Sequence, residues 1–305
     1  MVFPSGSQAP IIPTGRIRDP GYAYLVYAGD PPDEVFPTLF AAGDSCYDGS
    51  WVRGKIGNYA LKFDGTDDYV TIGSTSDFAW MHGKGDTSSF KWSVAFWMKL
   101  NTLPSGIDTH AIILNTNALA TGAGFSIDFD DDGDSRSILL LILNSSNQTI
   151  AALQNDDSYP DDLDWHHVVV TFDKGAASNN AKIYMDGSLT AQGNDDTNTP
   201  TDGNSNTVLT IGANAAGAGG YFFPGTLDEL AIWDKVLDST DIGQLYNSGN
   251  GQPASNIQAS KLVSYFNFEE GTGAGAIGNP SSAISGALNG TMHNMVLGKR
   301  LRGCT

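Results

Sequence analysis

The chain has 305 residues, and its 16 Lys and Arg against 34 Asp and Glu give a formal net charge of −18. A surface with this charge repels phosphate backbones, so we expect no nucleic-acid partner. No stretch is apolar for long enough to span a bilayer, so we expect no membrane partner either. The hydrophobic content of 40% includes six Trp, eleven Tyr and fourteen Phe, which supports a packed core.

Two features near the ends of the chain bear on its compartment. The N-terminus, "MVFPSGSQAP", has no apolar core behind a basic start, so the pattern predicts no secretory signal. Cys46 and Cys304 lie near opposite ends and give neither a disulfide framework nor zinc-ligand spacing. Whether these two cysteines pair is left open.

In chain order, residues 1–53 are rich in Pro and Gly and predict an N-terminal arm with one candidate strand at 22–28. Residues 54–250 show short strands separated by turn signals. Residues 251–305 predict an extension that adds one strand, within 261–270, and then a Gly/Ser-rich tail.

The clearest strand lies at 91–100, "KWSVAFWMKL", where apolar residues alternate but Ala95 and Trp97 spoil the polar face. This pattern predicts a strand that is covered on both sides. Asp186-Gly187 separates two extended runs, which is a strong hairpin signal. We interpret the acidic stretch 128–137 as another turn. Further candidate strands lie at 110–114, 124–129, 137–143, 148–153, 165–172, 181–185, 188–192, 207–212 and 226–233.

One helix is predicted after residue 238. Asp238 or Ser239 can cap it, Ile242 and Leu245 have helical spacing, and Gly249 can end it. Many short strands with a single short late helix predict an all-β fold, a two-sheet antiparallel β-sandwich of the jelly-roll type.

A family resemblance covers residues 54–250 approximately. Its motifs, in order, are "GKIGNYALKFDGTDDYVTIG", "FKWSVAFWMKL", "DWHHVVVTFD", "AKIYMDGSLT", "LTIGAN" and "FPGTLDELAIWDKVLDSTDIGQLYNSG". The series resembles a laminin-G-like jelly roll of the concanavalin A-like lectin/glucanase superfamily. The tail "LVSYFNFEEGTG" is similar to a segment found beside such domains in bacteriophage and marine viral proteins. The resemblance implies the fold, whereas this scaffold hosts lectins, glycosidases and adhesive modules.

We expect no enzyme. Glucanases on this scaffold resemble one another in carboxylates at alternating positions of one strand, which places nucleophile and acid on one face. Here Glu269 and Glu270 are adjacent, as are Asp228 and Glu229, so an extended chain would point each pair to opposite faces. His166 and His167 are likewise adjacent, which disfavours a shared zinc ion, and the resemblance implies that Trp165 and His167 are structural.

Structural calcium is the more plausible metal chemistry. The resemblance implies it, and hard cations take carboxylate and carbonyl oxygens where loops cross strand ends. The candidate ligands are Asp64, Asp67 and Asp68, with Asp228 as a distant partner. The alternative interpretation is a plain turn between two strands.

Glycan binding would need exposed aromatic rings. Tyr221 and Phe222 follow a Gly/Ala-rich loop and are the candidate glycan-binding residues. The resemblance implies that Phe223 belongs to a core strand.

The leading functional hypothesis is a non-enzymatic virion protein, a capsid decoration or fibre component at the virion surface that is made in the host cytoplasm. Its expected partners are neighbouring capsid or fibre subunits, which makes it oligomeric on the particle, and polysaccharide. The alternatives are a calcium-dependent lectin or adhesin and, third, a glycoside hydrolase.

Overall fold

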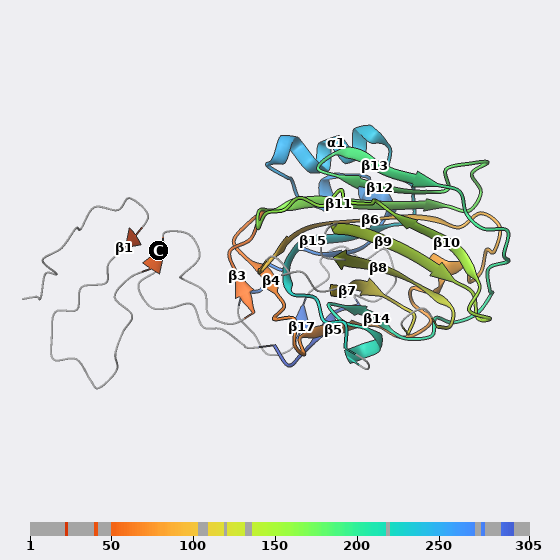
Figure 1. The fold of residues 1–305 in the computed structure, drawn as a ribbon, viewed down its shortest axis with the longest axis horizontal. Coiled ribbons are helices and arrows are strands. Elements are labelled where there is room, and N and C mark those ends of the chain that lie inside the picture. Colours follow the sequence, from red (N-terminus) through yellow and green to blue (C-terminus); the bar gives the residue numbers. More distant parts are fainter. Residues whose placement is uncertain are drawn as a thin grey trace, which may run out of the picture.

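The structure is a computed structural model. It describes residues 22–23, 40–41, 50–102, 109–118, 121–131, 136–217, 220–271, 276–277 and 288–295. Within these residues two antiparallel sheets stack face to face, so the predicted all-β sandwich is confirmed (Figure 1).

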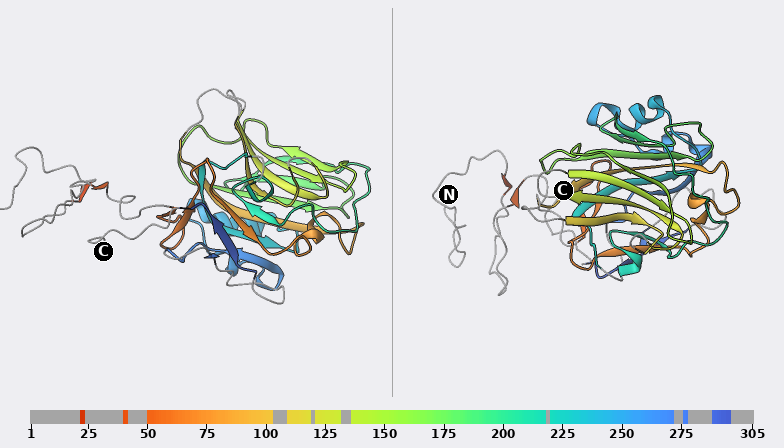
Figure 2. Two further views of the ribbon diagram at one scale, coloured as in Figure 1. Left: turned by 90° about the horizontal axis from the view of Figure 1, so that it is seen from below. Right: turned by 45° about the vertical axis from the view of Figure 1, so that its right-hand side comes forward.

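We call the two layers the front sheet and the back sheet. The front sheet runs in the order β10 (Thr149–Gln154), β9 (Arg136–Leu143), β8 (Gly124–Asp131), β7 (Thr109–Asn115), β14 (Leu209–Ile211), β5 (Tyr69–Ile72), β18 (Gly290–His293) and β17 (Ala276–Ile277). In Figure 2, right, β7, β8 and β9 lie side by side as the yellow-to-green strands.

The back sheet also has eight strands. It runs in the order β13 (Ser188–Gly193), β12 (Ala181–Met185), β11 (His166–Asp173), β6 (Lys91–Leu100), β15 (Gly225–Trp233), β4 (Ala60–Lys62) and β3 (Trp51–Val52), and β16 (Leu262–Phe266) pairs with β15. β1 (Tyr22–Ala23) and β2 (Phe40–Ala41) pair with each other. Short 3₁₀ turns are η1 (Ala79–His82), η2 (Ala215–Gly217), η3 (Asn247–Gly249), η4 (Ala254–Asn256) and η5 (Ala259–Lys261).

The main core fills the space between the sheets, because alternate residues of each strand point inward. In β6, Trp92, Phe96 and Met98 join this core, whereas Ala95 joins a second cluster on the outer face of the back sheet. The predicted strand with both faces covered is therefore confirmed.

The second cluster lies beneath helix α1 (Ser239–Tyr246), drawn in blue at the top of Figure 1. The Asp238 side chain accepts from Thr240 N and Asp241 N in a capping box, which confirms the predicted helix start. Ile242 and Leu245 pack on the sheet. The helix ends at Tyr246, before the predicted Gly249, because Asn247 adopts a left-handed conformation.

The predicted acidic turn at 128–137 is wrong in part. β8 extends through Asp131 and β9 begins at Arg136, so Asp128 to Asp131 are strand residues. Asp131 is fully buried, and Arg136 Nε donates to its Oδ2 over 2.8 Å. The end of β8 is therefore a paired strand, although its amino-acid composition is typical of turns.

Segments at both ends of the jelly-roll region complete the sheets. Trp51–Val52, expected within the arm, form β3, and the expected added strand is β16 on β15. β18, much later in the chain, pairs with β5 in the front sheet. Cys46, Cys304 and residues 24–28 of the candidate first strand lie outside the described residues. Among the helices of the described segments, none has the length and apolarity to cross a bilayer.

Candidate functional site

The acidic turn at Asp64–Asp68 carries the chain from β4 in the back sheet to β5 in the front sheet. The Asp64 amide donates to Asp68 Oδ2 over 2.9 Å, and the Thr66 amide donates to Asp64 Oδ1 over 2.7 Å. The Asp67 amide also donates to Asp64 Oδ1, over 3.3 Å. These bonds order the loop, while Val70, in the strand that follows it, packs in the core.

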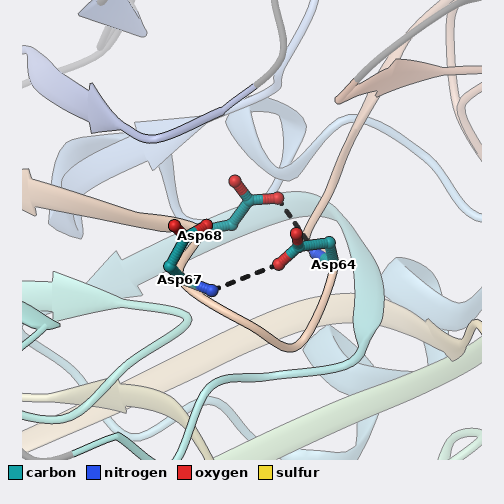
Figure 3. Close-up of side chains that lie close together, drawn as sticks. All are labelled: Asp64, Asp67 and Asp68. Carbon is teal, nitrogen blue, oxygen red and sulfur yellow. Dashed lines mark hydrogen bonds between the residues drawn. The ribbon is translucent and has the colours of Figure 1, made fainter.

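The turn gathers three carboxylates (Figure 3). One oxygen each from Asp64, Asp67 and Asp68 lies within 4.8 Å of the others. Asp64 and Asp67 are exposed and Asp68 is buried. Burial, together with the charges of Asp64 and Asp67, raises the pKa of Asp68 to about 6, against the lowering effect of the Asp64 amide.

These three residues fit a calcium ion by donor type, because calcium takes carboxylate oxygens and tolerates irregular geometry. A bound cation would also favour the ionised form of Asp68, which burial and its two neighbours disfavour. Whether calcium binds here remains a prediction.

The structure does not bring Asp228 to this turn. Asp228 lies in β15, fully buried, and Oδ2 accepts from Lys55 N at 2.8 Å and from Ile56 N at 2.9 Å. Its Oδ1 accepts from its neighbour Glu229 N at 2.8 Å. Burial, and the charge of Glu229, hold the pKa of Asp228 well above its usual range. Asp228 therefore anchors the segment before β4, which accounts for its position without a metal.

The expectation that Asp228 and Glu229 point to opposite faces is wrong. The register of β15 on β6 breaks between Asp228 and Ala231, and Glu229 has a φ of 54°. Leu227 and Leu230 both join the main core, so this β-bulge places two residues, instead of one, between successive inward positions.

Glu229 is held by two donors. Tyr265 Oη donates to Oε2 over 2.6 Å and Ala254 N donates to it over 3.0 Å. Burial, together with the charge of Glu269, raises the pKa of Glu229 to about 7. Because Asp228 and Glu229 are both buried and hydrogen-bonded, a substrate has no access to this pair.

The candidate glycan-binding residues follow the front-sheet strand β14. Tyr221 is 39% exposed and has a φ of 59°, and its carbonyl accepts from Ile112 N of β7 over 2.9 Å. Phe222 is half-buried. Phe223 is fully buried and lies edge-on to Phe63, which confirms the core prediction for it. Tyr221 is thus fixed by its backbone while its ring faces solvent.

The acidic turn and the Tyr221 segment lie against each other. A Cβ placed on Gly65 would lie 2.9 Å from Cβ of Pro224, and one on Gly217 would lie 2.6 Å from the ring of Tyr69. The Phe63 and Phe223 rings are 6.1 Å apart. The acidic turn therefore packs against the segment that follows Tyr221 and Phe222 in the chain.

A further polar feature escaped the sequence analysis. Ser126, Asn115, Thr210, Thr71 and Thr291 are direct partners across five adjacent strands of the front sheet. Both neighbours of Ser126, Thr210 and Thr71 lie in the main core, as do Leu114 beside Asn115 and Met292 beside Thr291. Because side chains alternate along a strand, these five side chains lie on the face of the sheet opposite the main core. A polar residue between two apolar ones, as in "VTI" and "LTI", was the available signal. The order of the strands in the sheet, which brings these residues into one row, could not be read from the sequence.

Comparison with solved structures finds the same sandwich elsewhere. A protein from Bacteroides ovatus, provisionally described as carbohydrate-binding, matches at 13% identity with a TM-score of 0.50, over 91% of this chain and 67% of that one. The enzymatically active domain of tailspike protein 2 from bacteriophage CBA120 matches at 13% identity and a TM-score of 0.50, over 73% of this chain and 33% of that one. At such identities these likenesses show the fold alone.

No curated protein matches the chain. A family model described as the concanavalin A-like lectin/glucanases superfamily does match, over residues 64–243. This span contains the acidic turn, the Tyr221 segment and the start of helix α1, and it agrees with the observed sandwich. The chain belongs to the concanavalin A-like lectin/glucanase superfamily.

Proposed function

We propose that this chain is a non-enzymatic carbohydrate-binding protein that is displayed on a bacteriophage particle. The single observation that carries the binding role is the exposed Tyr221 ring, whose backbone is bonded to β7. Aromatic rings held on a rigid scaffold stack on the apolar faces of sugars, and nearby polar groups then supply orientation. The solved relative described as carbohydrate-binding supports the same role.

The binding test uses a glycan array together with soluble neutral polysaccharides, since a net charge of −18 disfavours anionic ones. Tyr221→Ala is expected to abolish binding. Leu163→Ala is the matched control, because Leu163 is another exposed large apolar side chain, at 47%. Equal binding by Tyr221→Ala and the wild type would refute the assignment of Tyr221.

Calcium is proposed as a structural partner of this region. The acidic turn packs on Pro224, close to Tyr221, so a cation on Asp64, Asp67 and Asp68 would stiffen the segment that presents the ring. We expect calcium to raise the melting temperature of the wild type, but not that of Asp67→Asn. An unchanged melting temperature on removal of calcium would leave these carboxylates as turn residues only. Repeating the array with a chelator tests whether glycan binding depends on the cation.

Display on a virion is supported by the similarity of the C-terminal segment to those of bacteriophage proteins and by the tailspike structure. The partners would be neighbouring capsid or fibre subunits, with the chain oligomeric on the particle. Mass spectrometry of purified particles should find the chain in stoichiometric amounts. Its absence from washed particles would refute the virion role and leave a free lectin or adhesin.

A further inference from the structure

His166, the first residue of β11, contacts two carboxylates at once. Its Nδ1 lies 2.8 Å from Asp186 Oδ2, and its Nε2 lies 2.9 Å from Asp162 Oδ1. Asp186 belongs to the turn between β12 and β13, and Asp162 belongs to the connection 155–165 that leads from β10 to β11. One imidazole therefore joins two surface segments that are otherwise separate in the sequence.

The number of hydrogens on the His166 ring follows from which groups at this contact can donate a hydrogen bond. A neutral imidazole has one N–H, and an ionised carboxylate can only accept, so two simultaneous bonds require both ring nitrogens to carry hydrogen. Burial disfavours ionised Asp186, but hydrogen bonds from His166 and from the His167 amide hold its pKa below the usual range. Burial likewise acts against ionised Asp162, and bonds from His166 and the Asp164 amide lower its pKa.

We propose that His166 is an imidazolium ion that fastens the 155–165 connection to the β12–β13 turn, and that loss of its proton releases Asp162. The contact with Asp162 is the one that breaks, because Asp186 has a second hydrogen bond: its Oδ1 accepts from His167 N over 2.9 Å. The Asp162 side chain is also the more exposed of the two, at 43% against 30%. A neutral His166 would keep the bond to Asp186 and present a lone pair to Asp162.

The surroundings of His166 agree with a cation. Burial works against the charged ring, but its bonds to Asp186 and Asp162 raise the pKa of His166 above the usual value. The Tyr159 ring lies edge-on at 5.2 Å. Arg136 of β9 reaches the same connection, where it pairs with Asp161, and it also pairs with Asp131. His167 is the opposite case: burial lowers its pKa to about 3, so it is neutral.

The sign of the pH effect follows from the raised pKa. Stabilisation of the connection is complete below about pH 6.5, the value for an unperturbed histidine. It is lost as the pH rises through the folded-state value. The connection is therefore closed below about pH 6.5 and opens once the pH exceeds the raised pKa of His166.

Two measurements on the full chain test this proposal. NMR of the imidazole nitrogens should show that His166 titrates above pH 6.5 with both nitrogens protonated below its pKa, while His167 stays neutral. Hydrogen exchange of residues 156–164, corrected for intrinsic rates, should lose about five-fold in protection across that titration, the size expected for one partly exposed charged pair.

The decisive variants are Asp162→Asn and Asp164→Asn, which remove the same charge from the same connection. Of these two residues, Asp162 is the one whose carboxylate contacts His166. Asp162→Asn should lower the pKa of His166 and abolish the protection step, whereas Asp164→Asn should preserve both. The proposal is overturned if His166 titrates at or below pH 6.5, if the wild type shows no protection step, or if Asp162→Asn behaves like Asp164→Asn.

Discussion

Glu229→Gln tests whether the ionised, buried side chain of Glu229 in the β-bulge lowers the free energy of unfolding. In the folded chain, burial raises the pKa of Glu229 from 4.5 to about 7, although bonds from Tyr265 and Ala254 oppose that rise. Gln resembles the protonated acid in shape and charge, and its carbonyl oxygen can accept both bonds that Oε2 now accepts. The variant therefore removes the titration and keeps the contacts.

The magnitude follows from the pKa difference. A rise from 4.5 to about 7 corresponds to about 3 kcal/mol of differential stability. Because the folded-state pKa is the higher one, this contribution is fully present below about pH 4.5 and is lost as the pH rises through about 7. We expect the wild type and Glu229→Gln to be about equally stable near pH 4.5. At pH 8 the variant should be the more stable of the two, by about 3 kcal/mol.

Urea unfolding at pH 4.5, 6, 7 and 8 measures this difference directly. Asp68 and Asp228 also have raised pKa values, so the wild-type slope alone is not diagnostic, but the difference between the two proteins isolates Glu229. Tyr265→Phe serves as a second variant. It removes a hydrogen bond that lowers the pKa of Glu229. The pH range over which the Glu229 contribution to stability is lost should therefore extend to higher pH. Parallel curves for wild type and Glu229→Gln from pH 4.5 to 8 would refute the reasoning.

Three further predictions concern stability. Asp238→Ala removes the helix cap and should cost about 0.5–2 kcal/mol in urea unfolding; no loss would mean that α1 is held by packing alone. Phe223→Ala should cost about 3–5 kcal/mol, whereas Tyr221→Ala should stay within about 0.5 kcal/mol of wild type, and similar losses would contradict their different burial. Gly212→Ala should lower the melting temperature strongly, because its φ is 83° and the new Cβ would lie 2.4 Å from the Phe63 ring; an unchanged value would refute that contact.

The sequence determined most of the secondary structure, since the signals for it are local. Alternation predicted β6 with both faces covered, and Asp238 predicted the helix start. These two predictions depend on neighbours within a few residues. Phe223 was assigned to the core by the family resemblance, and it is fully buried.

Local pattern misled where strand pairing or a bulge imposes the conformation. An acidic stretch that favours a turn became the end of β8, because it pairs with β9 and because Arg136 compensates Asp131. Strict alternation failed at Glu229, because a bulge in β15 shifts one residue relative to β6.

Only the tertiary structure decided how the candidate sites are assembled. The turn Asp64–Asp68 crosses between the sheets and packs on Pro224, while Asp228 is drawn away to the amides of Lys55 and Ile56. The two carboxylates on His166 come from the connection that crosses from β10 in the front sheet to β11 in the back sheet and from the β12–β13 turn. Local propensity sets the elements, but contacts between residues far apart in sequence follow from strand order and register, which composition does not encode.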